Sequence, residues 1–292
     1  KSPKYGEKLK SNQVDWLGIF LLMAFIGSLQ YVLEHGQQDD WFNNKTIIIL
    51  STITVFGLVL FIWRELTYKR PVVNLGVLKD GNLRIGTVMC FILGFGLYGS
   101  TLIIPIYTQT ILGWTATDAG LLLIPGSITT AFMMPIVGKL LQRGVPQSYM
   151  VGLGFLIFFF FTYMMHNNMT PSTGVEHLYW GLILRGIGLG LLFVPITTLS
   201  LSTLKGKDIG EGAAFTGMMR QLGGSFGIAT ITTFITRFNQ EHRVNLVSHL
   251  DTTRLEVQQR VLTLQKGFMS KGFTANESLN KAYQVIDYSV MK

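Results

Sequence analysis

The chain has 292 residues, of which 48% are hydrophobic and only 14% are charged, and its mean hydropathy is +0.38. This composition is too apolar for an ordinary soluble domain. The formal net charge of +8 does not indicate nucleic-acid binding, because no basic cluster alternates with exposed aromatic residues. The single cysteine, Cys90, excludes disulfides within the chain and thiolate metal sites, and the five histidines have no metal-ligand spacing. No metal or other cofactor is therefore expected.

Seven apolar segments follow one another along the chain, each close to the roughly 20 residues that cross the hydrocarbon of a bilayer. They cover residues 14–33, 46–63, 85–108, 119–141, 148–165, 178–203 and 213–235. We therefore expect an all-α polytopic membrane protein with about seven transmembrane helices. Residues 64–84 form a basic connector in which the apolar spacing of VVNLGVL predicts a short surface helix. After Arg237 the chain is polar, and its Val and Leu spacing predicts amphipathic helices.

Positively charged residues alternate between the two sides of these segments. The loops and ends on one side hold thirteen Lys and Arg residues, whereas the short loops on the other side hold only Lys45. Because Lys and Arg favour the cytoplasmic side, the start of the chain is expected in the cytoplasm and the tail outside. The first residue is not methionine and no secretory signal pattern follows, which we interpret as a sign of an excised or truncated piece.

Two arginines, Arg185 and Arg220, lie well inside apolar segments. An arginine at membrane depth costs at least about 2.5–3.5 kcal/mol on insertion scales, so it is retained where it faces a protein interior or a water-filled path. Arg185 has no obvious acidic partner, and we favour a role for it in such a path. For Arg220 two interpretations stay open, a transport role and a helix-anchoring ion pair or carbonyl clamp.

Small residues and prolines recur within the apolar segments. GFGLYG, at residues 94–99, matches the GxGxxG pattern of dinucleotide-binding loops, but no strand precedes it and no βαβ unit surrounds it. We interpret it instead as a site of close helix packing. The residues to which we assign a packing role are Gly94, Gly188, Gly217, Gly224, Pro125 and Pro195. Beside the prolines, hydroxyls are expected to bond to helix carbonyls; these are Thr129, Thr130, Thr197 and Thr198.

Four stretches carry a resemblance to a known family. They are IGSLQYVLEHGQQDDWF (26–42), RPVVNLGVLKDGNLRIG (70–86), PIYTQTILGWTATDAGLLLIPG (105–126) and FTGMMRQLGGSFG (215–227). In this order they resemble the second half of EmrB/QacA-type drug exporters, which are fourteen-helix drug:proton antiporters of the major facilitator superfamily. The first stretch is particularly similar to the EmrB branch.

The resemblance implies a domain organisation. Residues 1–13 would be a cytoplasmic linker, residues 14–63 two extra helices between six-helix bundles, and residues 64–84 a cytoplasmic connector. Residues 85–236 would be five helices of the second bundle. Residues 237–292 would be a periplasmic loop before a last helix that the chain lacks, as it lacks the first bundle. For this tail two interpretations stay open, docking of an adaptor protein and a solvated loop without a partner.

The function implied is multidrug efflux: proton-driven export of amphipathic drugs or toxic compounds by alternating access in the bacterial inner membrane, with no enzyme activity. A periplasmic adaptor protein and an outer-membrane channel are the implied partners. Side chains that could line the substrate path are Tyr98, Tyr107, Gln109, Arg185, Arg220 and Gln221. Aromatic and amide groups give adaptable contacts to such compounds. For Tyr107 and Gln109 an interfacial belt at a helix end is the alternative.

The acid that would carry the proton is not evident. The interiors of the third to seventh segments contain no Asp or Glu, and Asp15, Glu34 and Asp118 lie near segment ends, so we interpret these three as interfacial. The coupling carboxylates are expected in the absent first bundle.

Three other classes of protein were weighed against this function. A seven-span receptor would have the opposite orientation, and a membrane enzyme would need a catalytic cluster that does not occur. A major facilitator permease for a small nutrient or metabolite remains the alternative.

Overall fold

The computed structural model describes residues 15–68, 75–171, 173–249 and 255–291. The expected linker at residues 1–13 and the start of the VVNLGVL segment lie outside these residues. The described residues form two compact units, Lys1–Ile231 and Thr232–Lys292, and the long helix α7 (Lys207–His249) crosses from one to the other.

Helices are the only regular elements of the described residues, and several begin at a side chain that caps the free amides of the first turn. Asp15 accepts the Gly18 amide at 3.0 Å, Asp80 accepts the Leu83 amide at 2.9 Å, and Thr115 accepts the Asp118 amide at 3.2 Å. The first-unit helices are α1 (Trp16–His35), α2 (Lys45–Thr67), α3 (Gly81–Thr110), α4 (Ala116–Gln142), α5 (Gln147–Asn168), α6 (Val175–Leu201) and the start of α7. Short 3₁₀ helices η2 (Trp41–Asn43) and η3 (Leu75–Lys79) lie between α1 and α3.

Each of the seven predicted segments coincides with one helix over all or nearly all of its described residues, so the all-α polytopic fold is confirmed. Six helices of the described part, α1 to α6, are long and apolar enough to cross a membrane. Helix α7 holds the predicted seventh span but is not among them, because Arg220, Gln221 and several glycines make this helix more polar. The seventh span therefore stays a prediction. The predicted connector helix is seen in part, as η3.

Helices α1 and α2 pair as a hairpin. Ser28 and Thr54 share a hydrogen bond of 2.8 Å at the middle of the pair, and Gly57 lets α2 approach the backbone of Phe25. The outward faces of both helices carry large exposed apolar side chains, among them Phe20, Met23, Val55, Phe56 and Val59. Such faces suit contact with lipid.

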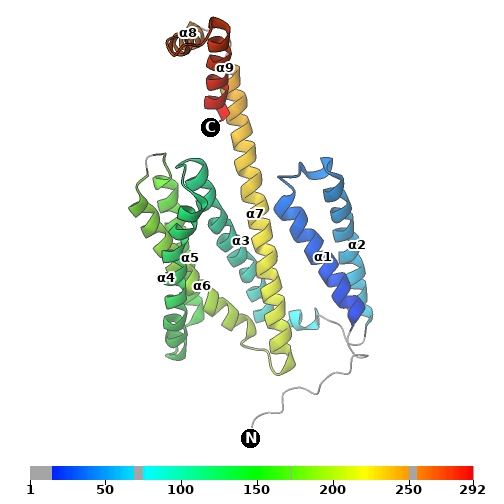
Figure 1. The fold of residues 1–292 in the computed structure, drawn as a ribbon. Coiled ribbons are helices and arrows are strands. Elements are labelled where there is room, and N and C mark those ends of the chain that lie inside the picture. Colours follow the sequence, from blue (N-terminus) through cyan, green and yellow to red (C-terminus); the bar gives the residue numbers. More distant parts are fainter. Residues whose placement is uncertain (1–14, 69–74, 172, 250–254, 292) are drawn as a thin grey trace. The chain divides into compact units, whose positions relative to one another are not determined.

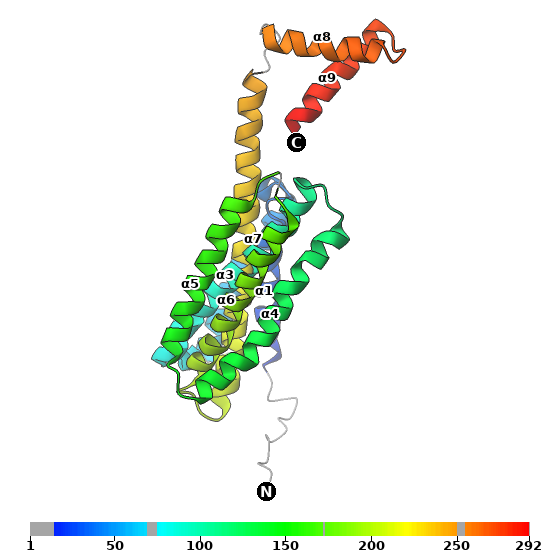
Figure 2. The ribbon, with the colours of Figure 1, turned by 90° about the vertical axis from the view of Figure 1, so that its left-hand side faces the viewer.

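Helix α6 is the centre of the remaining bundle and packs against α3, α4 and α5 (Figure 2). Glycines allow these close approaches: a Cβ at Gly186 would lie 2.4 Å from the carbonyl oxygen of Gly126 on α4, and one at Gly188 would lie 3.2 Å from the amide nitrogen of Phe158 on α5. Apolar side chains fill the space between the helices, including Ile104, Leu122, Phe161 and Leu182.

The second unit contains the rest of α7 with α8 (Leu255–Met269) and α9 (Ala275–Met291), and the last two pack against each other. The expected helical tail is thus confirmed. At the start of helix α9 the Glu277 carboxylate accepts hydrogen bonds from Thr274, and that of the Thr274 amide is 3.0 Å long. The hydrogen bonds from Thr274, first that of its amide, lower the pKa of Glu277.

Candidate functional site

The contact between α3 and α7 is made backbone to backbone. A Cβ added at Gly94 would lie 1.9 Å from the Arg220 carbonyl oxygen, and one at Gly223 would lie 2.0 Å from the Phe91 carbonyl oxygen. Gly224 lies against the ring of Tyr98, where a Cβ would be 2.4 Å from a ring carbon. Gly94 and Gly224 therefore both lie at close contacts between α3 and α7. GFGLYG is part of the continuous helix α3 and not a dinucleotide loop.

Polar and aromatic side chains flank this contact. The hydroxyl of Tyr98 on α3 donates a hydrogen bond of 2.9 Å to Oε1 of Gln221 on α7, and this pair is exposed. One residue earlier, the half-buried Arg220 has its guanidinium carbon 4.6 Å from the ring centroid of Phe193 on α6. A cation over an aromatic face is a favourable contact that leaves the guanidinium donors available. Three of the predicted path residues are therefore brought together where α3, α6 and α7 meet (Figure 1).

Arg185 lies apart from this group in a different environment. It is 6% exposed on α6 and bonds to one turn of α3, where Nε donates to Ser100 Oγ at 2.9 Å and Nη2 donates to the Leu97 carbonyl at 3.2 Å. Nη2 also donates to the Thr101 hydroxyl. These contacts make Arg185 an interhelical clamp, although the sequence favoured a role in the path for this residue. A role of Arg185 in the substrate path stays a prediction.

Tyr107 and Gln109 lie towards the end of α3, away from Tyr98. Tyr107 is 5% exposed in an apolar cluster and its hydroxyl donates to the Thr170 carbonyl at 2.6 Å, which ties α3 to the loop after α5. Gln109 is exposed. Tyr107 lies nine residues after Tyr98, or about 14 Å along the helix. The structure therefore does not bring Tyr107 and Gln109 together with Tyr98, Arg220 and Gln221.

The other packing predictions have mixed outcomes. Gly188 packs closely against α5, and Pro125 and Pro195 lie inside α4 and α6. A Cβ at Gly217 would meet nothing within 4 Å, so a packing role of Gly217 stays a prediction. The predicted hydroxyl bonds to helix carbonyls are confirmed for all four residues, with distances of 2.8 to 2.9 Å: Thr129, Thr130, Thr197 and Thr198.

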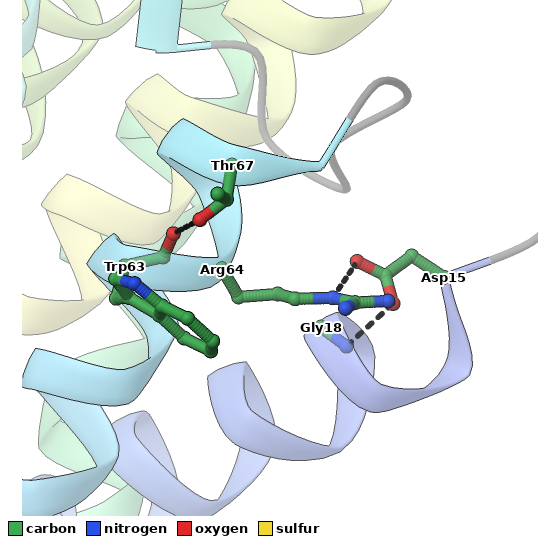
Figure 3. Close-up of polar contacts among 5 residues, drawn as sticks. All are labelled: Asp15, Gly18, Trp63, Arg64 and Thr67. Carbon is green, nitrogen blue, oxygen red and sulfur yellow. Dashed lines mark hydrogen bonds and ion pairs between the residues drawn. The ribbon is translucent and has the colours of Figure 1, made fainter.

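An ion pair closes the α1–α2 hairpin at the start of α1 (Figure 3). Nη2 of Arg64 lies 3.1 Å from Oδ1 of Asp15, and Nε lies 3.2 Å from Oδ2, while the same carboxylate caps α1 through Gly18. Burial by itself raises the pKa of Asp15, but the Arg64 hydrogen bonds, the Gly18 amide and the Arg64 charge outweigh it, so the pKa is lowered. Asp15 is therefore a structural anion that fixes α2 to α1.

A second acid joins α3 to the chain after α6. Oδ1 of Asp80 accepts the Thr203 hydroxyl at 2.8 Å as well as the Leu83 amide. These hydrogen bonds, the Leu83 amide first, lower the pKa of Asp80. Beside it, Asn82 donates to the Ser202 hydroxyl at 3.3 Å. The start of α3 is thus tied to the end of α6 by polar contacts on both sides.

Sequence reasoning missed one acid that contacts the bundle. Glu34, interpreted as interfacial, is half-buried, and its Oε1 accepts the Ser225 hydroxyl of α7 at 3.1 Å. Phe193 was missed as well, because an apolar ring in an apolar helix gives no signal in the sequence. Glu34 was detectable only as an acid close to a segment end, and its partner is 191 positions away.

Long apolar helices with buried arginine and hydroxyl groups, packed through glycines, define the class of multi-pass membrane transporters. The family described as Major Facilitator Superfamily matches residues 11–228, and the chain belongs to this family.

Several curated relatives are similar over most of the chain. Fatty acid resistance protein FarB of Neisseria gonorrhoeae is 30% identical over 261 residues, which is 89% of this chain and 51% of FarB. Multidrug export protein EmrB of Escherichia coli (strain K12) is 29% identical over 245 residues, covering 84% of this chain and 48% of EmrB. EmrB of Haemophilus influenzae is 30% identical over 241 residues, covering 82% and 46%. The chain therefore spans about half the length of these relatives.

Proposed function

We propose that the chain is the second-half portion of a proton-driven exporter of amphipathic compounds, which works by alternating access in a bacterial inner membrane. The observation that carries the proposal is the exposed Tyr98–Gln221 hydrogen bond beside the Arg220–Phe193 contact. This group combines aromatic faces, an amide and a cation in the middle of apolar helices. Binding sites of major facilitator transporters lie near the bilayer midplane, at the interface of their repeats.

The names of the relatives support a substrate that is amphipathic. One is named a multidrug export protein and another a fatty acid resistance protein. A fatty acid has an apolar body and a polar head, which is the kind of compound that we propose as substrate. Aromatic rings contact an apolar body with little geometric demand, while Gln221 and Arg220 can orient a polar head. The orientation that we propose has the start of the chain in the cytoplasm, from the alternation of Lys and Arg. A periplasmic adaptor and an outer-membrane channel are proposed as partners on the resemblance alone.

Efflux of ethidium from energised cells that carry the complete natural chain tests this function. Tyr98→Phe removes one hydrogen bond of about 1 kcal/mol and is expected to reduce the efflux rate about fivefold, and Gln221→Ala at least as much. Gln142→Ala, at the exposed end of α4, is the matched control and should leave efflux unchanged. A long-chain fatty acid is the second substrate to test. Accumulation of a nutrient, with no loss of either compound from the cells, would overturn the proposal in favour of a permease.

A further inference from the structure

The C-terminal end of α1 brings the acid Glu34 to a stretch of α7 that has no acid of its own, since α7 carries no Asp or Glu between Glu211 and Glu241. Glu34 is half-buried, and its Oε1 lies 3.1 Å from the hydroxyl oxygen of Ser225, a residue that is 1% exposed. In the first unit the C-terminal end of α1 comes near α7, whereas the start of α1 lies away from it (Figure 1). An acid inside a membrane protein is by default a functional residue.

The contact lies at the C-terminal end of α1 but well inside α7, away from both ends of that helix. Ser225 follows Gln221 by four residues, or about 6 Å along α7. Gln221 in turn bonds to Tyr98, in the middle of α3. Glu34 is therefore the last-turn acid of a short helix that ends beside the proposed substrate group, although its place in the sequence suggested a membrane interface.

Ser225 can serve both protonation states of this acid. In the structure its hydroxyl has two acceptors, Oε1 of Glu34 at 3.1 Å and the Gln221 carbonyl oxygen at 3.5 Å. A serine hydroxyl carries one proton to donate and two lone pairs that accept. When Glu34 is a carboxylate, the hydroxyl donates to it. When Glu34 is a carboxylic acid, the Ser225 hydroxyl can accept a hydrogen bond from it and donate its own hydrogen to the Gln221 carbonyl.

We infer that Glu34 is a proton-binding site of the transporter, with Ser225 as the hydroxyl that links it to the substrate group. The inference rests on the proposed function. Proton release breaks the O–H bond of the Glu34 carboxylic acid, leaves a carboxylate that accepts from Ser225, and passes the proton to water. A cation bound at the Tyr98–Gln221 group favours the carboxylate, and by reciprocity the proton opposes binding of the cation.

The other titratable or charged groups near this end of α1 do not neutralise Glu34 in the structure. They are Tyr31 and His35 on α1, Asp39 and Asp40 in the following turn, and Arg220 on α7. The His35 ring stacks on Tyr31 with centroids 4.4 Å apart, and its Nδ1 is buried with no hydrogen-bond partner among the described residues. The Arg220 guanidinium lies over Phe193. The one salt bridge within the described ranges joins Arg64 to Asp15.

The test measures protons released per ethidium bound by the purified full-length protein, together with the Kd for ethidium between pH 6 and 8. One competing proton changes this Kd by up to about tenfold per pH unit in the wild type. Glu34→Gln should release no proton on binding and should hold the Kd within about twofold across that range. Glu176→Gln, an exposed acid at the start of α6, is the matched control and should behave as the wild type.

The outcomes separate this inference from the function on which it rests. A wild type that binds neither ethidium nor a long-chain fatty acid, or that binds ethidium without releasing a proton, overturns the proposed function and the inference with it. A wild type that releases a proton, with equal release from Glu34→Gln, leaves the function standing and overturns the inference. The inference is also overturned if His35→Gln loses proton release and Glu34→Gln keeps it. If Glu34→Gln does not fold, Ser225→Ala takes its place. A shift of the pH at which half of the proton is released supports the inference, and an unchanged pH overturns it.

Discussion

Removal of the Arg185 clamp should destabilise the transporter. Arg185 makes three hydrogen bonds to α3, and bonds between helices in membranes are worth about 0.6 kcal/mol on average and up to about 1.7. Arg185→Ala is therefore expected to lower the free energy of unfolding of the full-length protein by about 2–5 kcal/mol. The hydroxyls of Ser100 and Thr101 keep their bonds to the carbonyls of Gly96 and Leu97, so neither is left unpaired in the variant.

Arg220→Ala is the comparison, since Arg220 has a cation–π contact in place of a clamp. Its removal should cost about 1 kcal/mol and should mainly impair substrate binding. Arg185→Lys keeps the charge without the planar fork and should lie between wild type and Arg185→Ala. Denaturant unfolding of the protein in detergent, followed by tryptophan fluorescence, measures all three. An Arg185→Ala protein that is as stable as wild type but no longer transports would refute the clamp and return Arg185 to the substrate path.

Three further predictions follow from contacts at the helix interfaces. Gly94→Ala should force α3 and α7 apart and cost about 1–3 kcal/mol in an unfolding experiment, whereas Gly217→Ala should be neutral; equal effects would contradict the assigned contacts. Asp80→Asn should lower the melting temperature at neutral pH, and the difference from wild type should vanish as the pH falls below the ordinary value of 3.8, because the folded-state pKa of Asp80 is depressed. Asp15→Arg and Arg64→Asp should each lower the melting temperature by loosening the α1–α2 hairpin, and the double exchange should recover part of this loss, but not the part due to the lost Gly18 cap; no recovery at all would show that the pair does not hold the hairpin.

The membrane helices could be predicted from the sequence because the signal is local. Each of six apolar runs is long enough to cross lipid. Hydroxyl bonds such as Thr129 to the Pro125 carbonyl are local as well, and they were predicted correctly. The seventh run was harder to assign as a membrane span, because Arg220 and Gln221 make it more polar.

The partners of the polar groups could not be predicted, because they depend on how helices rotate against each other. Nothing in the sequence separates Arg185, which clamps α3, from Arg220, which stacks on a ring. The sequence also does not distinguish Gly94, which lies against the backbone of α7, from Gly217, where a Cβ would meet nothing within 4 Å. Glu34 is the clearest example, since its contact with Ser225 depends on how α1 packs against α7 and not on its position along α1.

The central claim, proton-driven export of amphipathic compounds, is tested most directly with the complete natural chain in liposomes. With an acidic interior and a neutral exterior, outward proton flow should drive ethidium into the lumen, and a protonophore should abolish this uptake. Ethidium is permanently charged, so protein-free liposomes should not concentrate it in response to the pH gradient. Uptake above these liposomes that collapses with the gradient is the predicted result. Uptake no greater than in protein-free liposomes, or uptake indifferent to the protonophore, would contradict the account.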